Sequence, residues 1–315
     1  MEKNRKFLAS AAGIFVSFFL FSIAQEKITK TQYINSDGTR ENFIYSMSLV
    51  FVYCCMNYLF SLIITRFIKQ EDNTPQVYYA MSGLVYSLAM ICSNLALQFV
   101  SYPTQVIAKS CKPIPVMIFG VLLGKKSYSL RKYIFVGMVV FGVILFLYKD
   151  KKDKKEQNEF EGMGLGELLV LSSLFMDGVY SALQERMKAD YQTKSLCMMT
   201  SLNKWATICL GILWVLTKEV FTFFAFLQRQ PSVIWKLGAL SICGFCGQFS
   251  MISMVTEFGT LPAAIVATIR KFFTVLVSVL LLGNTLLGRQ WVATMIIFTG
   301  LFLDILYGKT VVKSK

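Results

Sequence analysis

Long apolar stretches alternate with short polar segments along nearly the whole chain. Ten stretches of about twenty residues, the length that crosses a bilayer as a helix, lie at roughly 7–25, 43–65, 78–100, 103–123, 130–148, 163–184, 196–217, 233–256, 260–282 and 288–307. Backbone groups cannot stay unpaired in lipid, and the regular alternation typical of membrane strands is missing from the sequence. The pattern predicts an all-α membrane protein with ten transmembrane helices.

The first stretch has the outline of a secretory signal, because Lys3, Arg5 and Lys6 precede its apolar run. That run is longer than in a typical cleaved signal, and nine more stretches follow it. We expect a retained first helix.

The second half of the chain resembles the first. A shift that moves residue 98 onto residue 257 lays 98–148 over 257–307 without a gap. The pairs aligned in this register include Pro103 with Pro262 and Lys112 with Lys271. Such self-similarity predicts a duplication, and five helices per copy place the copies in opposite senses. The predicted parts are a first five-helix repeat at 1–150, a charged lumenal linker at 151–162, and a second five-helix repeat with a short tail at 163–315.

Composition supports the membrane class. The 315 residues are 55% hydrophobic and 14% aromatic, with a mean hydropathy of +0.55, which is too apolar for soluble domains. A net charge of +14 would suggest nucleic acid in a soluble protein, but many of the lysines and arginines lie in short loops. We therefore expect membrane lipids around the chain and no nucleic-acid partner. The positive-inside rule places both termini in the cytosol, and only the lysines of the linker argue against this orientation.

Cysteine and histidine usage limits the chemistry. The eight cysteines lie in or beside apolar stretches, which predicts no disulfide framework. Cys243 and Cys246 form a C-x-x-C motif without a second pair. The chain contains no histidine, so histidine triads and histidine metal sites are excluded. We predict no metal site, no catalytic residue and no cofactor.

Four cations lie inside apolar stretches, where each costs about 2.5–3.5 kcal/mol. They are Lys109, Lys112, Arg270 and Lys271. Their matched positions in the two predicted repeats suggest a water-filled cavity that binds an anion. The alternative is pairing with buried carboxylates, for which the sequence offers Asp177, Glu257 and Asp304.

Two prolines directly follow the first pair of cations. Pro113 and Pro115 lack the amides that would bond the carbonyls of Lys109 and Cys111. We expect a kink or a loosened turn there, a feature of transporter substrate sites and also of ordinary membrane helices.

Neutral polar residues in or near the apolar stretches are candidates for contacts with a base or a ribose. They are Asn94, Gln98, Tyr102, Asn203 and Gln248. The alternative for each is a hydrogen bond between helices. Glu26 and Lys27 are candidates for an ion pair at a lumenal gate, with a surface role as the alternative.

Several runs resemble one known family. They are Gln98–Met117 (QFVSYPTQVIAKSCKPIPVM), Thr268–Thr274 (TIRKFFT), Ala24–Thr29 (AQEKIT) and Gly166–Leu169 (GELL). The chain resembles, over nearly its whole length, the nucleotide-sugar transporter family, solute carrier family 35. Within subfamily B it is most similar to the branch of the UDP-galactose transporter homolog, or endoplasmic reticulum ATP/ADP exchanger.

The resemblance implies a ten-helix drug/metabolite transporter fold and a secondary active antiporter rather than an enzyme. It implies exchange of ATP for ADP by alternating access, with UDP-galactose or UDP-glucose exchanged for UMP as the alternative. It also implies that the four cations bind phosphates. The expected location is the endoplasmic reticulum membrane, with the Golgi as the alternative. Hypotheses of other classes are a membrane-embedded transferase with a phosphate-bearing donor and an anion channel. The oligomeric state is not predicted.

Overall fold

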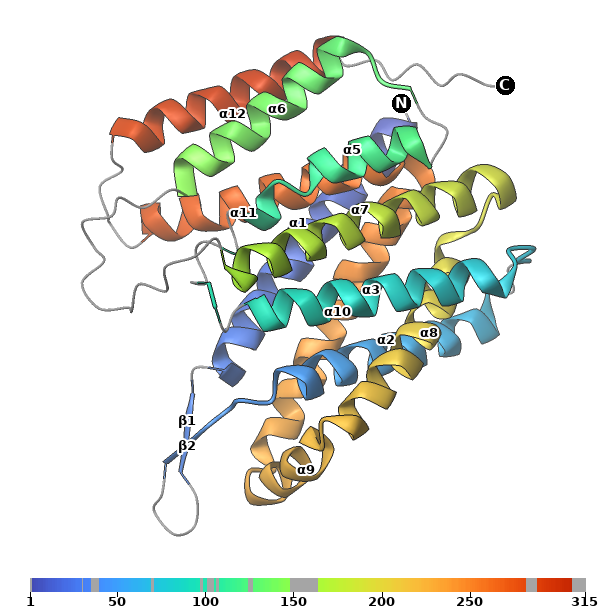
Figure 1. The fold of residues 1–315 in the computed structure, drawn as a ribbon, viewed down its shortest axis with the longest axis vertical. Helices are drawn as coiled ribbons and strands as arrows, with labels where there is room; N and C mark the ends of the chain where they lie inside the picture. The colour runs from blue at the N-terminus through green and yellow to red at the C-terminus, as the bar shows by residue number, and fades with distance from the viewer. Residues whose placement is uncertain are drawn as a thin grey trace. The chain divides into compact units, whose positions relative to one another are not determined.

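Helices make up nearly all of the chain that the structure describes. This computed structural model describes residues 2–29, 31–34, 40–68, 71–96, 99–100, 105, 108–123, 127–147, 164–281 and 288–307. The helices are α1 (Glu2–Thr29), α2 (Ser46–Phe67), α3 (Gln76–Ala96), α5 (Pro113–Leu122), α6 (Leu130–Leu147), α7 (Leu165–Tyr191), α8 (Ser195–Leu216), α9 (Glu219–Arg229), α10 (Ser232–Phe258), α11 (Thr260–Leu281) and α12 (Gly288–Tyr307) (Figure 1). Strands β1 (Gln32–Ile34) and β2 (Arg40–Asn42) form a short antiparallel pair.

Every predicted stretch overlaps one of these helices. Five of the described helices are long and apolar enough to cross a membrane, namely α1, α2, α7, α8 and α10. A helical protein with several membrane spans is thus confirmed, whereas ten crossings and the inverted repeat stay predictions. The all-α prediction was wrong in one detail, because it missed the hairpin of β1 and β2.

Contacts divide the chain into two compact units. Unit 1 comprises Met1–Ser87 and Met187–Phe258, and unit 2 comprises Leu88–Arg186 and Gly259–Lys315. Each unit therefore combines segments from both predicted repeats. The boundaries fall within α3 and α7 and between α10 and α11, so the contact units are not the predicted halves of the chain.

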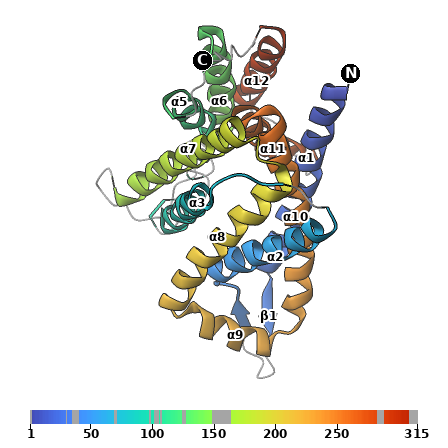
Figure 2. The ribbon, with the colours of Figure 1, turned by 90° about the vertical axis from the view of Figure 1, so that its right-hand side faces the viewer.

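In unit 1, α1 packs along α10 and α2 packs along α8 (Figure 2). Small residues permit the close approach of α1 and α10, since Gly13 lies directly against the side chain of Ser250. The rings of Phe7 and Phe258 meet edge to face, with centroids 5.1 Å apart. The first predicted stretch is therefore a helix packed into this unit.

At one end of unit 1, the hairpin lies near α9 (Figure 2). Buried aromatic residues of both segments belong to one hydrophobic cluster. Phe223 and Phe226 of α9 are buried there, next to Tyr33. Burial raises the pKa of Tyr33. Glu219 begins α9 and accepts hydrogen bonds from the amide and the hydroxyl of Ser48. The extra apolar sequence after α8 is thus a short amphipathic helix that covers this cluster, and the ten predicted stretches did not include it.

In unit 2, α6 packs along α12 and α5 packs on α11 (Figure 1). The core between α5, α6 and α11 includes Val116, Val140 and Ile265. The register that aligns the two halves of the sequence lays α6 on α12, and both segments are helical. This agreement is consistent with a duplication, which stays a prediction.

Candidate functional site

The backbone near Lys109 and Lys112 departs from a regular helix just before α5. The amide of Lys112 bonds the carbonyl of Lys109 at 3.4 Å, and the amide of Ile114 bonds the carbonyl of Cys111 at 2.9 Å. Both bonds span three residues instead of the four of an α-helix. Pro113 and Pro115 cause this, because neither ring nitrogen can donate to these carbonyls. The expected loosened turn is confirmed, and it aims both lysines at α7.

One carboxylate receives both lysines. Lys109 Nζ lies 2.9 Å from Asp177 Oδ2, and Lys112 Nζ lies 3.2 Å from Asp177 Oδ1. Lys109 also donates to Ser173 Oγ at 2.5 Å. The Ser173 hydroxyl in turn donates to the carbonyl of Ala89 on α3 at 2.7 Å. Pairing with a buried carboxylate, the alternative raised from the sequence, is therefore present for these two cations.

The pairing leaves a surplus of positive charge. Two ammonium groups face one carboxylate, so the three side chains carry a net charge of +1. The side chains of Lys109 and Lys112 keep 19% and 28% of their surface exposed, whereas Asp177 keeps 12%. The ammonium of Lys112 has three donors, and its hydrogen bond to Asp177 uses one of them. Lys112 can therefore also donate to a further anion.

The sequence analysis missed the polar stripe on α7 that contains Asp177. Ser173, Asp177, Ser181 and Glu185 recur every four residues, and all four are buried. Residues four apart share one face of a helix, so this spacing was the available signal. Apolar residues flank each member of the stripe along the chain, so the hydropathy of the segment does not reveal these polar positions.

A glycine brings the stripe close to the lysines. A Cβ atom at Gly178 would stand 2.5 Å from Phe119 Cδ2 and 3.1 Å from the carbonyl oxygen of Pro115. Only a residue without a side chain lets α7 approach α5 this closely. Phe119 and Phe175 close the same contact with rings at 89° and centroids 4.9 Å apart. Gly178 thus positions its neighbour Asp177 beside Lys109 and Lys112.

The second carboxylate of the stripe fixes α11. Glu185 accepts hydrogen bonds from the backbone amide and the hydroxyl of Thr260, where α11 begins. A carboxylate at a helix N-terminus caps free amides and complements the helix dipole. Tyr128 lies near Glu185, and burial, followed by the charge of Glu185, raises the pKa of the Tyr128 phenol. The phenol therefore stays neutral.

The third cation, Arg270, lies on α11 and is half-buried. Its helix packs against α5, and Leu261 and Ile265 belong to the same buried cluster as Val116. The backbone of Lys271 is helical, but its side chain lies outside the described residues. All four predicted cations thus belong to unit 2. Among them, Lys109 and Lys112 both contact Asp177.

The candidates for base or ribose contacts divide between described and undescribed residues. Asn203 is buried on α8 and its amide donates to the carbonyl of Met199, one turn back on the same helix, at 2.8 Å. Gln248 lies on α10, and its Oε1 is buried without a hydrogen-bond partner in the described chain. Gln98 and Tyr102 lie outside the described residues, as does the side chain of Asn94.

The proposed gate pair is only partly described. Lys27 is exposed in the last turn of α1, and its carbonyl accepts a hydrogen bond from Thr31. The side chain of Glu26 lies outside the described residues, so the ion pair stays a prediction.

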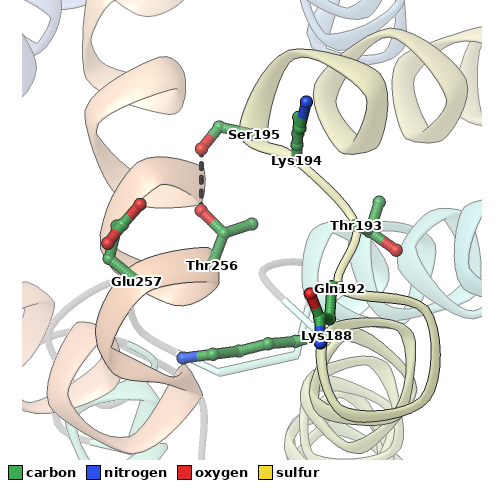
Figure 3. Close-up of a pocket in the computed structure, with 7 residues that line it drawn as sticks. All are labelled: Lys188, Gln192, Thr193, Lys194, Ser195, Thr256 and Glu257. Atoms are coloured by element: carbon green, nitrogen blue, oxygen red, sulfur yellow. Dashed lines mark hydrogen bonds between the residues drawn. The ribbon is translucent and has the colours of Figure 1, made fainter. Parts of the chain in front are cut away.

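A polar pocket of about 410 Å³ lies in unit 1, at the turn between α7 and α8 and the end of α10 (Figure 3). Lys188 and Lys194 line it together with the exposed carboxylate of Glu257. Ser195 and Thr256 share a hydrogen bond of 2.7 Å across the pocket. Among the described side chains, those of Lys109, Lys112 and Arg270 do not line this pocket. Glu257 is exposed and is therefore not the buried counter-ion that the sequence offered. The third candidate counter-ion, Asp304, has a side chain outside the described residues.

Comparison with known proteins identifies the family of this chain. The profile of the UAA transporter family matches residues 6–308, which is nearly the whole chain. The chain belongs to the UAA transporter family. The family and its relatives are transporters rather than enzymes, and the resemblance to solute carrier family 35, subfamily B, is confirmed.

Several relatives match over nearly their whole length. The solute carrier family 35 member B1 homolog of Drosophila melanogaster is 44% identical over 314 residues, which cover 98% of this chain and 92% of that protein. Solute carrier family 35 member B1 of Danio rerio is 42% identical over 311 residues, covering 98% and 94%. That of Rattus norvegicus is 43% identical over 304 residues, covering 96% and 94%. The chain is thus a multi-pass membrane transporter of the nucleotide-sugar transporter family.

A solved crystal structure supports the fold. It matches with a TM-score of 0.69 at 11% identity and covers 97% of this chain and 98% of its own. At this identity the match concerns the fold alone. Within the described residues, no group of three or more potential ligands could hold a metal ion.

Proposed function

We propose that this transporter is a nucleotide antiporter that exchanges ATP for ADP across the endoplasmic reticulum membrane. The observation that carries the proposal is the pairing of Lys109 and Lys112 with the single carboxylate of Asp177, in which the three side chains carry a net charge of +1 and both lysine side chains are partly exposed. Phosphate oxygens are strong acceptors for ammonium donors. Arg270 and Lys271 extend the proposed phosphate-binding set.

Asp177 has a specific role in this proposal. Between binding events it neutralises part of the charge of the lysines, which reduces the penalty of keeping two cations in an apolar segment. A phosphate group then competes with Asp177 for the same ammonium donors. The bound and unbound states differ in which anion the lysines face, so occupancy of the site is coupled to the arrangement of α5 and α7.

Family membership and the predicted topology support alternating access as the transport mechanism. In the proposal, both termini lie in the cytosol, and two inverted five-helix repeats expose the site to one side of the membrane at a time. ATP and ADP compete for one site, and the protein changes sides only when the site is occupied. The second candidate substrate pair is UDP-galactose or UDP-glucose exchanged for UMP, because the same phosphate-binding cations would serve both pairs. For the location, the Golgi membrane is the alternative to the endoplasmic reticulum membrane.

Counterflow by purified protein in liposomes tests the proposal. Vesicles are loaded with ATP, ADP, UMP or a UDP-sugar, and uptake of labelled nucleotide is measured from outside. We expect uptake of ATP to depend on internal ADP or ATP. Equal uptake into empty and loaded vesicles would indicate a channel, and formation of a covalent product would indicate a transferase.

Single substitutions link the transport to the cluster. Lys271→Ala is expected to lose nearly all exchange while the protein still folds and inserts. Lys204→Ala is the matched control, because Lys204 is an exposed lysine on α8 and its removal changes the net charge by the same amount. Wild-type exchange by the Lys271 variant, or equal losses in both variants, would refute the assignment of phosphate-binding residues.

A further inference from the structure

The polar pocket of unit 1 has no part in the proposed binding of phosphates by Lys109 and Lys112. Its volume is about 410 Å³, and the residues that line it belong to unit 1. They are Lys188, Gln192, Thr193, Lys194, Ser195, Thr256 and Glu257 (Figure 3). Of the described residues that line the pocket, none is aliphatic or aromatic. The lining therefore suits a small, strongly polar ligand and offers no ring on which a nucleobase could stack.

The turn between α7 and α8 holds Gln192 in a left-handed conformation at the edge of the pocket. Its φ is 51°, in a region that glycine adopts freely and other residues adopt at a cost. The amide of Gln192 bonds the carbonyl of Lys188 at 3.1 Å, as in a helix end that usually carries glycine. Glutamine brings a side-chain amide to the pocket, which glycine could not do. Residues held in a costly conformation cluster at functional sites, so the turn is a candidate binding element.

Contacts with the segment around the start of α3 fix this turn in place. The Thr193 hydroxyl donates to the carbonyl of Met187 at 3.0 Å, and it therefore accepts from the Thr74 hydroxyl at 2.6 Å. Both threonines are buried. The rings of Tyr78 and Tyr191 meet edge to face, with centroids 5.6 Å apart. The pocket is thus preformed, which reduces the entropic cost of binding a ligand.

Three of the five described helices that are long and apolar enough to cross a membrane end or begin at the pocket. Helix α7 ends at Tyr191, α8 begins at Ser195 and α10 ends at Phe258. The ends of spanning helices lie at the depth of the lipid headgroups. The contact of Phe258 with Phe7 places the pocket at the same end of unit 1 as the N-terminal part of α1, which the predicted orientation puts in the cytosol. In that orientation, headgroups of the cytosolic leaflet are available to the pocket.

Charges of both signs line the pocket, and the carboxylate pairs with neither lysine. Lys188 is half-buried, whereas Lys194 and Glu257 are exposed. Figure 3 shows the side chain of Lys188 extending from α7 toward α10, the helix that carries Glu257. Among the residues drawn there, the hydrogen bond joins Ser195 to Thr256, so neither lysine bonds Glu257. These separated charges, two positive and one negative, complement a ligand that has both an anionic and a cationic group.

We propose that this pocket binds the headgroup of a phosphatidylethanolamine lipid. The phosphate diester faces Lys188 and Lys194, because phosphate oxygens are strong acceptors for ammonium donors. The primary ammonium of the headgroup faces Glu257. Basic pockets at the cytosolic ends of membrane helices bind lipid headgroups, and the carboxylate here selects a headgroup with an ammonium over a purely anionic one. The proposal goes beyond nucleotide exchange and does not depend on which solute is transported.

Soluble headgroups provide the main test. Purified protein is titrated by calorimetry with glycerophosphoethanolamine, glycerophosphocholine and glycerophosphoglycerol. The wild type should bind the ethanolamine compound most tightly, because the quaternary ammonium of choline has no N–H group for Glu257 and glycerol has no positive charge.

Substitutions separate the roles of the charges. Glu257→Gln should weaken binding of glycerophosphoethanolamine about 10-fold, the effect of one charged hydrogen bond, and should not weaken binding of glycerophosphoglycerol. Lys188→Gln should weaken binding of both compounds, because each brings a phosphate. Lys194→Gln tests the same point if Lys188→Gln does not fold. The matched control is Lys204→Gln, because Lys204 is an exposed lysine on α8 outside the pocket.

Lipid vesicles identify the source of the headgroup. Wild type and Glu257→Gln are reconstituted in phosphatidylcholine with or without phosphatidylethanolamine, and thermal unfolding is measured. Phosphatidylethanolamine should raise the unfolding temperature of the wild type and have a smaller effect on Glu257→Gln. Binding of glycerophosphoethanolamine without this lipid effect would support the site and assign it to a soluble ligand of the same chemistry.

Three results would overturn the inference. The first is a wild type that prefers ethanolamine in neither assay, and the second is a Glu257→Gln variant that keeps the preference. The third is wild-type binding by both Lys188→Gln and Lys194→Gln. Nucleotide counterflow is measured separately. A protein that prefers ethanolamine but exchanges no nucleotide would refute the proposed function and leave this inference intact.

Discussion

Substitution of Lys112 by alanine separates a structural role of the cluster from a transport role. Lys112 makes one charged hydrogen bond with Asp177 at 3.2 Å, and 28% of its side chain is exposed. Exposed ion pairs contribute about 0–1 kcal/mol, and buried charged hydrogen bonds contribute about 1.5–3 kcal/mol. This bond lies between the two classes, so the free energy of unfolding should fall by about 1 kcal/mol. No charge is left uncompensated, because Asp177 keeps its bond of 2.9 Å to Lys109.

The expected loss of transport is much larger. A phosphate bound by Lys112 loses a charged hydrogen bond of about 1.5–3 kcal/mol, and about 1.4 kcal/mol corresponds to a factor of ten. Exchange at limiting ATP should therefore fall about 10–100-fold. A decrease of about 1 kcal/mol in a total stability of about 5–15 kcal/mol leaves almost all molecules folded. Reduced stability cannot produce the expected loss.

The assay combines counterflow with thermal unfolding of the same purified protein. Lys112→Gln is the matched variant, because it removes the charge and keeps most of the length of the side chain. Both variants should lose exchange while their unfolding temperatures stay within a few degrees of wild type. Wild-type exchange in either variant would show that Lys112 pairs with Asp177 but does not bind phosphate. The proposed phosphate site would then have to be abandoned.

Two other predictions concern α7. Gly178→Ala should lower the free energy of unfolding by about 1–3 kcal/mol, because the added methyl group meets Phe119 and the backbone of α5. The control in a thermal unfolding assay is Gly137→Ala on α6, where the added methyl group meets open space. Equal stability of the two variants would contradict the close approach of α7 and α5. Glu185→Gln should lower the free energy of unfolding by about 1–2 kcal/mol, because it weakens the cap at Thr260. The KM for ATP should change little. A large change in KM at unchanged stability would place Glu185 in the transport site instead.

Much of the candidate site follows from the sequence, and its central acid does not. Lys109 and Lys112 stand out because charge inside an apolar stretch is rare, and the prolines after them predict the loosened turn. Asp177 was only one of three acids available as counter-ions. Its selection depends on Gly178, which lets α7 approach α5. In the chain, α5, α6, the linker and the first half of α7 separate this glycine from Lys109.

The sequence by itself determined the membrane class, the positions of the long helices, the family and the cations that need a partner. These properties depend on local composition and on the cost of placing charge or unpaired backbone in lipid. Only the tertiary structure decided which groups meet: that Asp177 joins Lys109 and Lys112, that Glu185 caps α11, and that α9 covers an aromatic cluster. Such pairings depend on distances of a few ångströms between side chains that the sequence separates by dozens of residues.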